Sequence, residues 1–258
     1  QLLLEFKELY GSPLVIVRDM GKGLALSASN VFPESPQQIC QPHFIRDLEK
    51  DLVIKHHKDL KTSIIKHKLT SRLRELRILE NVDNPMKELQ QRWVHIAVDY
   101  LLYPIEKHIK WMSKTIAYFI QYRRIKEISC LVRRLVTWNA SNNCFYKPLM
   151  ELDTCLRAVL EDKTVTHHYR LLEKTLEWLD KLCEQLQISR DGHLKDKTSE
   201  EIDIEMVKEN VKKIIMSLSK EGRGLGSKYE DIASNINEAF DSHWDELFVP
   251  DPIVNGKK

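Results

Sequence analysis

The sequence predicts a mainly α-helical protein with a small α/β part near its N-terminal end. Two short runs, residues 14–17 and 37–40, each follow Gly or Pro residues, and their pattern favours two short strands. From about residue 43 to residue 247, apolar residues recur at spacings of three and four, which is the helical period. Gly is almost absent between Gly23 and Gly192, so this long segment has few interruptions.

The first elements follow from short local patterns. Residues 2–10 have the pattern of a short amphipathic helix. Leu14 to Val17 form a continuous apolar run, typical of a strand that is buried on both faces in the middle of an α/β sheet. A tight turn then leads into a helix over residues 24–31.

A second strand and a second helix come next. The strand covers residues 37–40, and we expect its last part, Gln38 to Cys40, to pair in parallel with Leu14 to Val17. The crossover through the helix of residues 24–31 should be right-handed, as such connections nearly always are. The following helix begins at His43, and its apolar positions have helical spacing: Phe44, Ile45, Leu48, Leu52 and Val53.

The remaining residues read almost wholly as helices joined by short turns. A turn at residues 81–85 has Asp83 or Asn84 as candidate N-cap of the next helix. That helix should bury Trp93, Ile96, Ala97, Tyr100 and Leu101. We further expect a loop at 138–146, a helix over 171–186 that ends near 189–192, a loop at 189–201, a helix over 204–218 that stops in the glycine-rich turn 222–226, and a helix over 229–247.

Composition and charge restrict the class of protein. The formal net charge is +2, but residues 1–150 hold 24 Lys and Arg against 15 Asp and Glu, whereas residues 151–258 hold 16 against 23. A basic front half fits a protein that contacts a polyanion on one side, although ordinary helical surface charge gives the same numbers. Five scattered Cys suit reduced thiols in a cytoplasm. With no run of 18 apolar residues and no leader at Gln1, we expect neither membrane insertion nor secretion, and the chain reads as part of a longer protein.

Asp19 is the best-placed chemical group in the sequence. It follows the first strand directly, and ligands of open α/β sheets bind beyond the carboxyl ends of the strands. Gly21 and Gly23 allow the chain to turn tightly after it. A carboxylate in this place can hold a metal ion, or it can simply cap the turn into the next helix.

The order of motifs around Asp19 resembles the middle of the catalytic domain of DDE transposases of the Mutator-like and related bacterial insertion-sequence type. The match covers about 40 residues and is weak elsewhere. In that family an Asp-x-Gly-x-Gly-Leu motif is followed by Phe-Pro, by Cys-x-x-His and often by His-Phe-x-Arg-Asp-Leu. The corresponding residues are Asp19, Gly21, Gly23 and Leu24, then Phe32 and Pro33, then Cys40 and His43, and finally Phe44, Arg46, Asp47 and Leu48.

The resemblance implies a function and a domain plan. Residues 1–52 would be part of an RNase-H-like catalytic domain, residues 53–247 an all-helical insertion, and residues 248–258 the return to the catalytic domain. Asp19 would be the catalytic second acidic ligand of Mg²⁺ or Mn²⁺ in metal-dependent DNA cleavage and strand transfer. The first Asp and the final Glu would lie outside this chain, so the fragment alone should be inactive.

The same resemblance implies the partners and the location. They would be the transposon ends and target DNA, with no membrane and with a possible homo-oligomer. The protein would act in a bacterial or archaeal cytoplasm, at the nucleoid.

Two further sets of residues are candidate sites. Cys40 and His43 have a spacing that could supply two zinc ligands, but a structural zinc site needs four and no second pair is evident. A thiol at the strand end and a histidine at the helix start is the favoured interpretation.

Residues 55–77 read as a helix and hold eight Lys and Arg against two acids, a surface that would attract DNA phosphates. A solvated helix face is the alternative explanation for such a run of charge. The cations expected on one face of that helix are Lys58, Lys61, Lys68 and Arg72. Arg123-Arg124 and Arg133-Arg134 are weaker candidates of the same kind.

An alternative function belongs to another class. The chain could be a non-enzymatic helical DNA-binding or scaffold protein in which Asp19 is a structural turn residue. The two classes differ in what should flank the chain. An upstream strand ending in Asp and a downstream helix bearing Glu, in one open reading frame, would favour the transposase.

Overall fold

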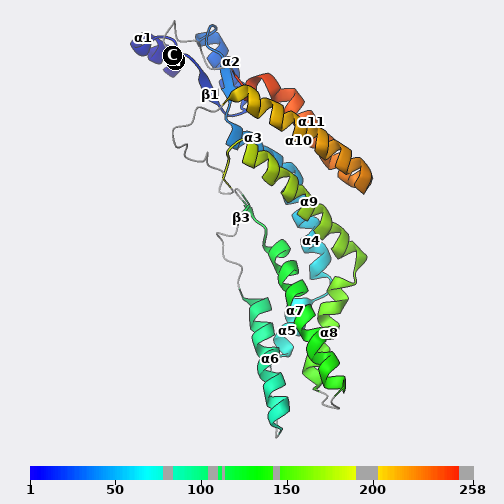
Figure 1. The fold of residues 1–258 in the computed structure, drawn as a ribbon. Helices are drawn as coiled ribbons and strands as arrows, with labels where there is room; N and C mark the ends of the chain where they lie inside the picture. Colours follow the sequence, from blue (N-terminus) through cyan, green and yellow to red (C-terminus); the bar gives the residue numbers. More distant parts are fainter. Residues whose placement is uncertain (78–83, 104–109, 112–113, 142–145, 190–202, 250–258) are drawn as a thin grey trace. The chain divides into compact units, whose positions relative to one another are not determined.

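A computed structural model describes residues 1–77, 84–103, 110–111, 114–141, 146–189 and 203–249. The described chain is mostly helical, with one small parallel sheet and one two-residue antiparallel pair. It divides into two compact units, residues 1–52 with residues 175–258, and residues 53–174. Each unit is described by itself, with the labels of Figure 1.

The sheet of the first unit has the predicted strand–helix–strand order. Helix α1 (Leu2–Tyr10) precedes strand β1 (Ile16–Arg18), helix α2 (Lys22–Val31) and strand β2 (Gln37–Ile39). The two strands are parallel and adjacent, with Val17 opposite Gln38. The prediction of two parallel strands joined through the helix is therefore confirmed, and the right-handed crossover stays a prediction.

The predicted burial of the first strand on both faces is wrong in this structure. Leu14 and Val17 are 61% and 64% exposed, and no residue of α1 is buried. Leu14 and Val17 point to opposite faces of the chain, so neither face of this run is fully covered among the described residues. Ile39 of β2, by contrast, is fully buried.

Helix α3 and the residues after it form the first part of the core. Helix α3 (Gln41–Leu48) begins two residues before the predicted start, because Pro42 fits the first helical turn. A π-helical segment, η1 (Glu49–Ile54), continues it. The five apolar positions expected here are all buried, as predicted: Phe44, Ile45, Leu48, Leu52 and Val53.

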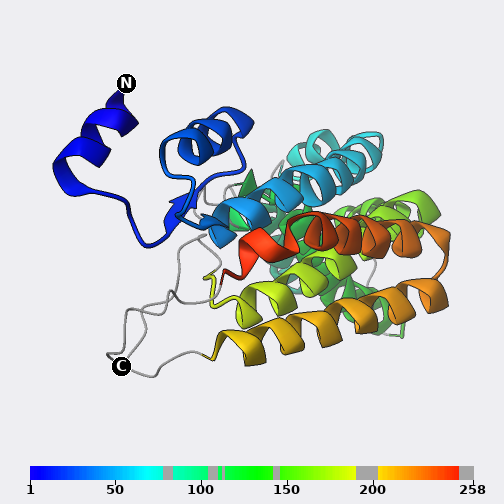
Figure 2. The same cartoon turned by 90° about the horizontal axis from the view of Figure 1, so that it is seen from above.

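The C-terminal helices belong to the same unit as the sheet. Helices α10 (Ile204–Leu225) and α11 (Ser227–Leu247) lie side by side, joined at Gly226, whose φ is 115° (Figures 1 and 2). Helix α11 contacts β2 and α3, and the Gln41 amide donates a hydrogen bond to the Leu247 carbonyl at 3.0 Å. The domain plan expected from the sequence instead assigns both helices to an insertion separate from the sheet.

The predicted apolar stripes of these two helices are largely buried, but the turn between them is shorter than predicted. Gly222 and Gly224 lie inside α10, and Gly226 alone makes the turn. Gly222 is needed in the helix because α11 passes so close. A Cβ at this position would lie 2.9 Å from the Tyr229 carbonyl oxygen.

The second unit is built from helices and one short strand pair. Its residues 53–174 include α4 (Lys55–Ile65), α5 (Leu69–Glu75), α6 (Pro85–Leu102), α7 (Ala117–Ser141) and α8 (Lys147–Leu160). Helix α9 (Lys163–Gln185) begins in this unit and ends in the first. The pair β3 (Lys110–Trp111) and β4 (Lys114–Thr115) was not predicted. The fully buried centre of the unit includes Leu60, Leu73, Val98, Ile125, Leu152 and Leu156.

Two predictions fail in this unit, and one is confirmed. Helix α7 extends to Ser141, so Trp138 begins no loop; residues 142–145 of the expected loop lie outside the described residues. Helix α6 buries Ala97 and Leu101 but leaves three predicted core residues, Trp93, Ile96 and Tyr100, exposed. Asn84 caps α6 as predicted, accepting a hydrogen bond from the Met86 amide at 2.8 Å.

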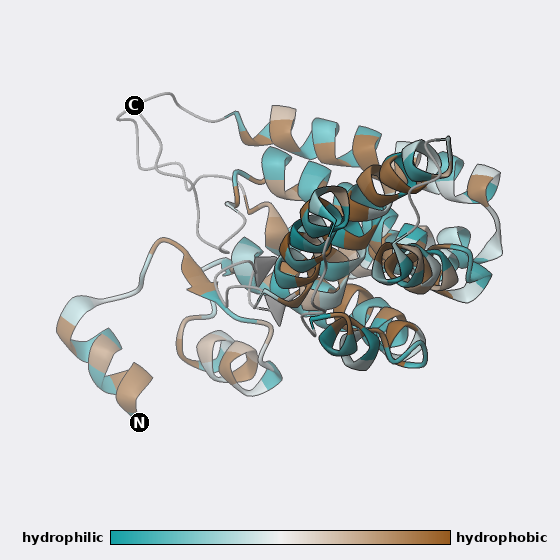
Figure 3. Ribbon diagram, turned by 90° about the horizontal axis from the view of Figure 1, so that it is seen from below, coloured by the Kyte–Doolittle hydropathy of each residue, from teal (hydrophilic) through white to brown (hydrophobic). Residues whose placement is uncertain are grey.

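The last predictions concern α9 and the membrane. Helix α9 buries its leucines at helical spacing, Leu171, Leu172, Leu176, Leu179 and Leu182. The expected loop at 189–201 falls almost wholly outside the described residues. The helices mix hydrophilic and hydrophobic residues along their length (Figure 3). Among the described residues, no helix has the length and apolarity needed to cross a membrane.

Candidate functional site

Asp19 lies at the carboxyl end of β1, as the sequence predicts. Its side chain is exposed, and its Oδ1 accepts a hydrogen bond from the Gly21 amide at 2.9 Å. A Cβ on residue 21 would lie 2.8 Å from that oxygen, so Gly21 makes room for the carboxylate. Within the described residues, Oδ2 makes no hydrogen bond. The carboxylate therefore caps the turn into α2 with one oxygen and presents the other to solvent.

Arg18, the residue before Asp19, ties the strand end to a distant helix. Its side chain is 6% exposed and donates three hydrogen bonds: Nε to Gln37 Oε1 at 2.6 Å, Nη1 to the Asp19 carbonyl at 2.9 Å, and Nη2 to Glu246 Oε2 at 2.9 Å. A buried guanidinium needs such partners, because an unpaired buried charge is strongly destabilising. Arg18 thus holds the backbone that carries Asp19 in a fixed position.

A groove of about 580 Å³ lies next to this strand end. Arg18, Lys22, Gln37, His243 and Glu246 supply its polar lining. In the part of the chain that the structure describes, no group of three or more His, Cys, Asp or Glu side chains is arranged to hold a metal ion. Among the described residues, a metal ion at Asp19 would therefore have this carboxylate as its ligand. The other ligands of the ion would have to come from water, from the substrate or from other residues.

Cys40 and His43 lie where β2 ends and α3 begins. Cys40 is a half-buried free thiol at the N-cap of α3, and His43 is exposed in the first turn of that helix. The two residues belong to no three-residue metal cluster within the described ranges.

The basic segment of residues 55–77 is not one helix, which corrects the prediction. The chain breaks between α4 and α5, and Lys68 adopts a left-handed conformation with φ of 50°. Lys58, Lys61, Lys68 and Arg72 are all exposed, and none forms an ion pair among the described residues of its unit. Because the helical path is interrupted, the four cations do not share one continuous helix face.

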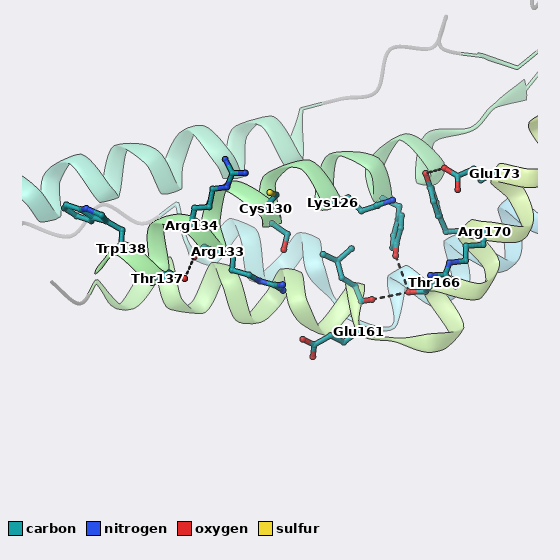
Figure 4. Close-up of a pocket in the computed structure, with 14 residues that line it drawn as sticks. Lys126, Cys130, Arg133, Arg134, Thr137, Trp138, Glu161, Thr166, Arg170 and Glu173 are labelled. Atoms are coloured by element: carbon teal, nitrogen blue, oxygen red, sulfur yellow. Dashed lines mark hydrogen bonds between the residues drawn. The ribbon is translucent and has the colours of Figure 1, made fainter. Parts of the chain in front are cut away.

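A groove of the second unit was not predicted as a site. It has a volume of about 1030 Å³ and lies along α7, with the end of α8 and the start of α9 opposite (Figure 4). Its charged residues are four cations and two acids: Lys126, Arg133, Arg134 and Arg170, with Glu161 and Glu173.

Internal contacts fix one end of this groove. Tyr169 donates a hydrogen bond to Glu173 at 2.6 Å and stacks on Phe119 at a centroid distance of 5.0 Å. Burial, and then the bond to Glu173, raise the pKa of Tyr169 well above its ordinary value. The Lys126 ammonium lies 5.2 Å from the Tyr169 ring centre, within cation–π range.

The three arginines of the groove are available for a ligand. Arg133 and Arg134 project from α7 and Arg170 from α9 (Figure 4), all three exposed. Among the described residues none of them forms an ion pair. Guanidinium groups in this state can bind phosphate or carboxylate oxygens in a bidentate way.

The sequence contains part of the signal for this groove. Arg133-Arg134 is a weak candidate by charge alone, and Lys126 lies seven residues before Arg133, which places both on one side of α7. Arg170 comes from another helix, so its position opposite α7 depends on tertiary packing. Comparison with family models, with curated proteins and with solved structures finds no match to this chain.

Proposed function

We propose that the chain is part of a DDE transposase, in which β1, β2 and α2 belong to an RNase-H-like catalytic domain and Asp19 is the second acidic metal ligand. The observation that carries the proposal is the place of the Asp-x-Gly-x-Gly motif, directly after a strand that pairs in parallel with the next one. Ligands of open α/β sheets bind at this edge. The motif order through Cys40 and His43 supports the same family.

Asp19 can supply one of the protein ligands of such a metal site. Mg²⁺ and Mn²⁺ prefer hard oxygen ligands and keep several waters, so a single exposed carboxylate oxygen per element suffices. Two such ions would activate the attacking oxygen and stabilise the leaving oxygen of the DNA strand. The hydrogen bond of Asp19 Oδ1 to Gly21 is compatible with this role, because Oδ2 remains for the ion.

A pair of substitutions separates the metal role of Asp19 from its turn role. Asp19→Asn keeps an oxygen that can accept the Gly21 hydrogen bond but removes the negative charge, whereas Asp19→Ala removes both. The protein from the complete open reading frame should be tested, with its flanking DNA as substrate and with Mn²⁺. Asp51→Asn, another exposed acid of the same unit, is the matched control.

The metal role predicts that Asp19→Asn lowers strand cleavage about a hundredfold or more, since metal activation contributes several kcal/mol. DNA binding and thermal stability should stay at the level of Asp51→Asn. If Asp19→Asn cleaves as well as the control and only Asp19→Ala is impaired, Asp19 is a turn residue and the transposase assignment of this site is wrong.

A second candidate function is a non-enzymatic helical protein that binds DNA, and the arginine-lined groove favours it. The groove follows α7 from Tyr122 to Trp138, which is about 24 Å at 1.5 Å per residue. A single DNA strand of a duplex presents about seven phosphates over that length. An open, elongated groove with unpaired arginines suits a polyanion better than a small compact ligand.

The groove and the α4–α5 cations can be compared in one binding experiment. Arg133, Arg134 and Arg170 are replaced by Gln in one variant, and Lys58, Lys61, Lys68 and Arg72 in another. Lys213, Lys220 and Lys228, exposed cations of the other unit, form a charge-matched control for the first variant. Affinity for a random duplex is measured over a range of salt concentrations.

Each lost phosphate contact should reduce the slope of log affinity against log salt by up to about 0.9. We expect the groove variant to lose more slope than its control, with little change in sequence preference. Equal slopes for the groove variant, the α4–α5 variant and the control would exclude both surfaces as DNA contacts.

A further inference from the structure

Helix α6 has an apolar seam whose side chains keep a large part of their surface exposed. Six apolar side chains follow one another at alternating spacings of three and four residues, and their exposed fractions lie between 39% and 60%. They are Met86, Leu89, Trp93, Ile96, Tyr100 and Tyr103. This is the a/d pattern of a coiled-coil helix, continued over more than two heptads.

The face of α6 next to the seam supplies the packing of this helix within the unit. Gln90, Val94, Ala97, Val98 and Leu101 are buried there. The seam contacts α7 only in part, through the hydrogen bond from Tyr100 to Glu127 at 2.9 Å, and much of its apolar surface stays exposed. Contiguous exposed apolar surface of this kind marks an interaction site more often than chance.

The surface beside the seam is also apolar. Trp93 and Ile96 of α6, with Ile128, Leu131 and Leu135 of α7, line a small apolar pocket of about 40 Å³. Leu131 is 51% exposed. The apolar surface of the seam therefore continues onto Leu131 of α7.

The charged residues beside the seam would form ion pairs between two copies of α6 that run antiparallel. Arg92 and Asp99 are exposed, seven residues apart, and occupy the same heptad position on one side of the seam. If two copies of α6 pair antiparallel, with Trp93 against Ile96, then Arg92 of each copy faces Asp99 of the other. In a parallel pair, Arg92 would face Ala97 and no ion pair would form.

We propose that α6 is a self-association surface, which binds α6 of a second copy of this chain in an antiparallel two-helix pair. The core layers are then Met86 with Tyr103, Leu89 with Tyr100, and Trp93 with Ile96, each occurring twice about the two-fold axis. This follows from α6 itself and does not rest on the proposed transposase function.

The contacts that these residues make within one chain do not prevent the pairing. Arg92 is paired with Glu88 at 2.6 Å and Asp99 with Arg77 at 3.0 Å, but all four side chains are largely exposed. Exposed pairs of this kind contribute little, so they can exchange partners. Arg124 lies over the Tyr100 ring and donates a hydrogen bond to the Tyr103 carbonyl at 2.7 Å, which holds the end of α6 in place.

The first arm of the test is the oligomeric state of the chain itself. Sedimentation velocity at chain concentrations from about 1 to about 200 µM detects dimers with dissociation constants in that range, which includes weak interfaces. We expect a monomer–dimer equilibrium that Ile96→Asp shifts at least tenfold toward monomer. Ile65→Asp is the matched control, because Ile65 is an exposed isoleucine of the same unit outside the seam. A chain that is monomeric throughout, or a dimer that both variants affect equally, overturns the proposal.

The second arm tests the antiparallel direction. Arg92→Glu and Asp99→Arg should each weaken the dimer several-fold, because each places like charges opposite one another twice. The two substitutions combined should restore it, since opposite charges would again face one another across the pair. Circular dichroism of each variant checks that the helices remain folded. A dimer that Ile96→Asp dissociates but that the charge exchanges leave unchanged would exclude the antiparallel pair.

Discussion

At the scale of single residues, the position of Asp19 depends on Arg18. The buried guanidinium joins β1 to Gln37 of β2 and to Glu246, and Glu246 lies 228 residues along the chain. Neither partner could be identified from the sequence, since an Arg at a strand end is ordinarily a surface residue. The structure therefore shows that Arg18, which belongs to none of the sequence motifs, helps to fix the position of the Asp19 carboxylate.

We predict that Arg18→Ala destabilises the protein by about 1–3 kcal/mol, because it removes three hydrogen bonds of a buried charge. The lower part of that range applies if Glu246, which is half exposed, stays well solvated. Lys213→Ala, in an exposed pair with Glu209, should cost less than about 1 kcal/mol. Chemical denaturation of both variants measures the difference, and equal losses would contradict the structural role of Arg18.

His57 makes a second residue-scale prediction, which concerns pH. Its Nε2 accepts a hydrogen bond from the Tyr118 amide at 3.1 Å, at the start of α7. Burial, and then the nearby Lys61 charge, lower the pKa of His57 below its ordinary value of 6.5. The folded protein therefore keeps His57 neutral at a pH where the unfolded chain protonates it.

The stabilisation from neutral His57 is complete above pH 6.5 and declines as the pH falls from there toward the lowered pKa, because the unfolded state binds more protons in that window. His57→Gln keeps an acceptor and removes the titration. We expect the melting temperature of the variant to fall less than that of the native chain between pH 7 and pH 5. Parallel curves for the two proteins would show that His57 does not titrate on unfolding.

At the scale of elements, the two glycines of α10 form a natural pair for comparison. Both lie in the last turns of the helix, but a Cβ at Gly222 would meet Tyr229 and Ala233 of α11, whereas a Cβ at Gly224 would have nothing within 4 Å. Helical propensity favours Ala over Gly at both positions by about 1 kcal/mol. Packing opposes it at Gly222 alone.

We predict opposite effects of the two Gly-to-Ala substitutions. Gly224→Ala should stabilise the protein by about 0.5–1 kcal/mol. Gly222→Ala should destabilise it by about 1–2 kcal/mol, because the Tyr229 carbonyl is backbone and cannot move aside. Thermal unfolding by circular dichroism compares the two, and a stabilising Gly222→Ala would mean that α10 and α11 pack less closely than described.

The cations of residues 55–77 do not share the predicted single helix face, because these residues form two helices. Residues 55–77 have helical spacing throughout, yet the chain breaks at Lys68. After the break, α5 buries Leu69 and Leu73, and α4 buries Leu60 and Ile64. The same apolar residues fit one long helix or two short ones, and burial in the folded unit selects the second.

At the scale of the whole molecule, the proposed function makes a prediction about DNA cleavage by this chain, because Asp19 would be one of three acidic metal ligands of the transposase site. The described residues hold no cluster of three acidic or metal-binding side chains. We predict that the 258-residue chain gives no nicking or strand transfer of plasmid DNA with Mg²⁺ or Mn²⁺. Metal-dependent nicking that Asp19→Asn abolishes would show instead that the site of this chain is complete.

The sequence by itself determined the features that depend on neighbouring residues. The apolar run before Asp19 predicts a strand, and the two glycines after it predict a turn, because backbone preferences act over a few residues. The helical periods of α9, α10 and α11 and the N-cap of α6 are predictable for the same reason. The place of Asp19 at a strand end therefore follows from local sequence alone.

Only the tertiary structure decided which faces are buried and which distant residues meet. Trp93, Ile96 and Tyr100 have the same apolar character as Ala97 and Leu101, yet only the latter pair is buried. Arg170 opposite Arg133, and Glu246 beside Arg18, are brought together by packing across long stretches of chain. Sequence pattern gives the period of a helix, but its rotation and its partners follow from the burial of side chains over the whole unit.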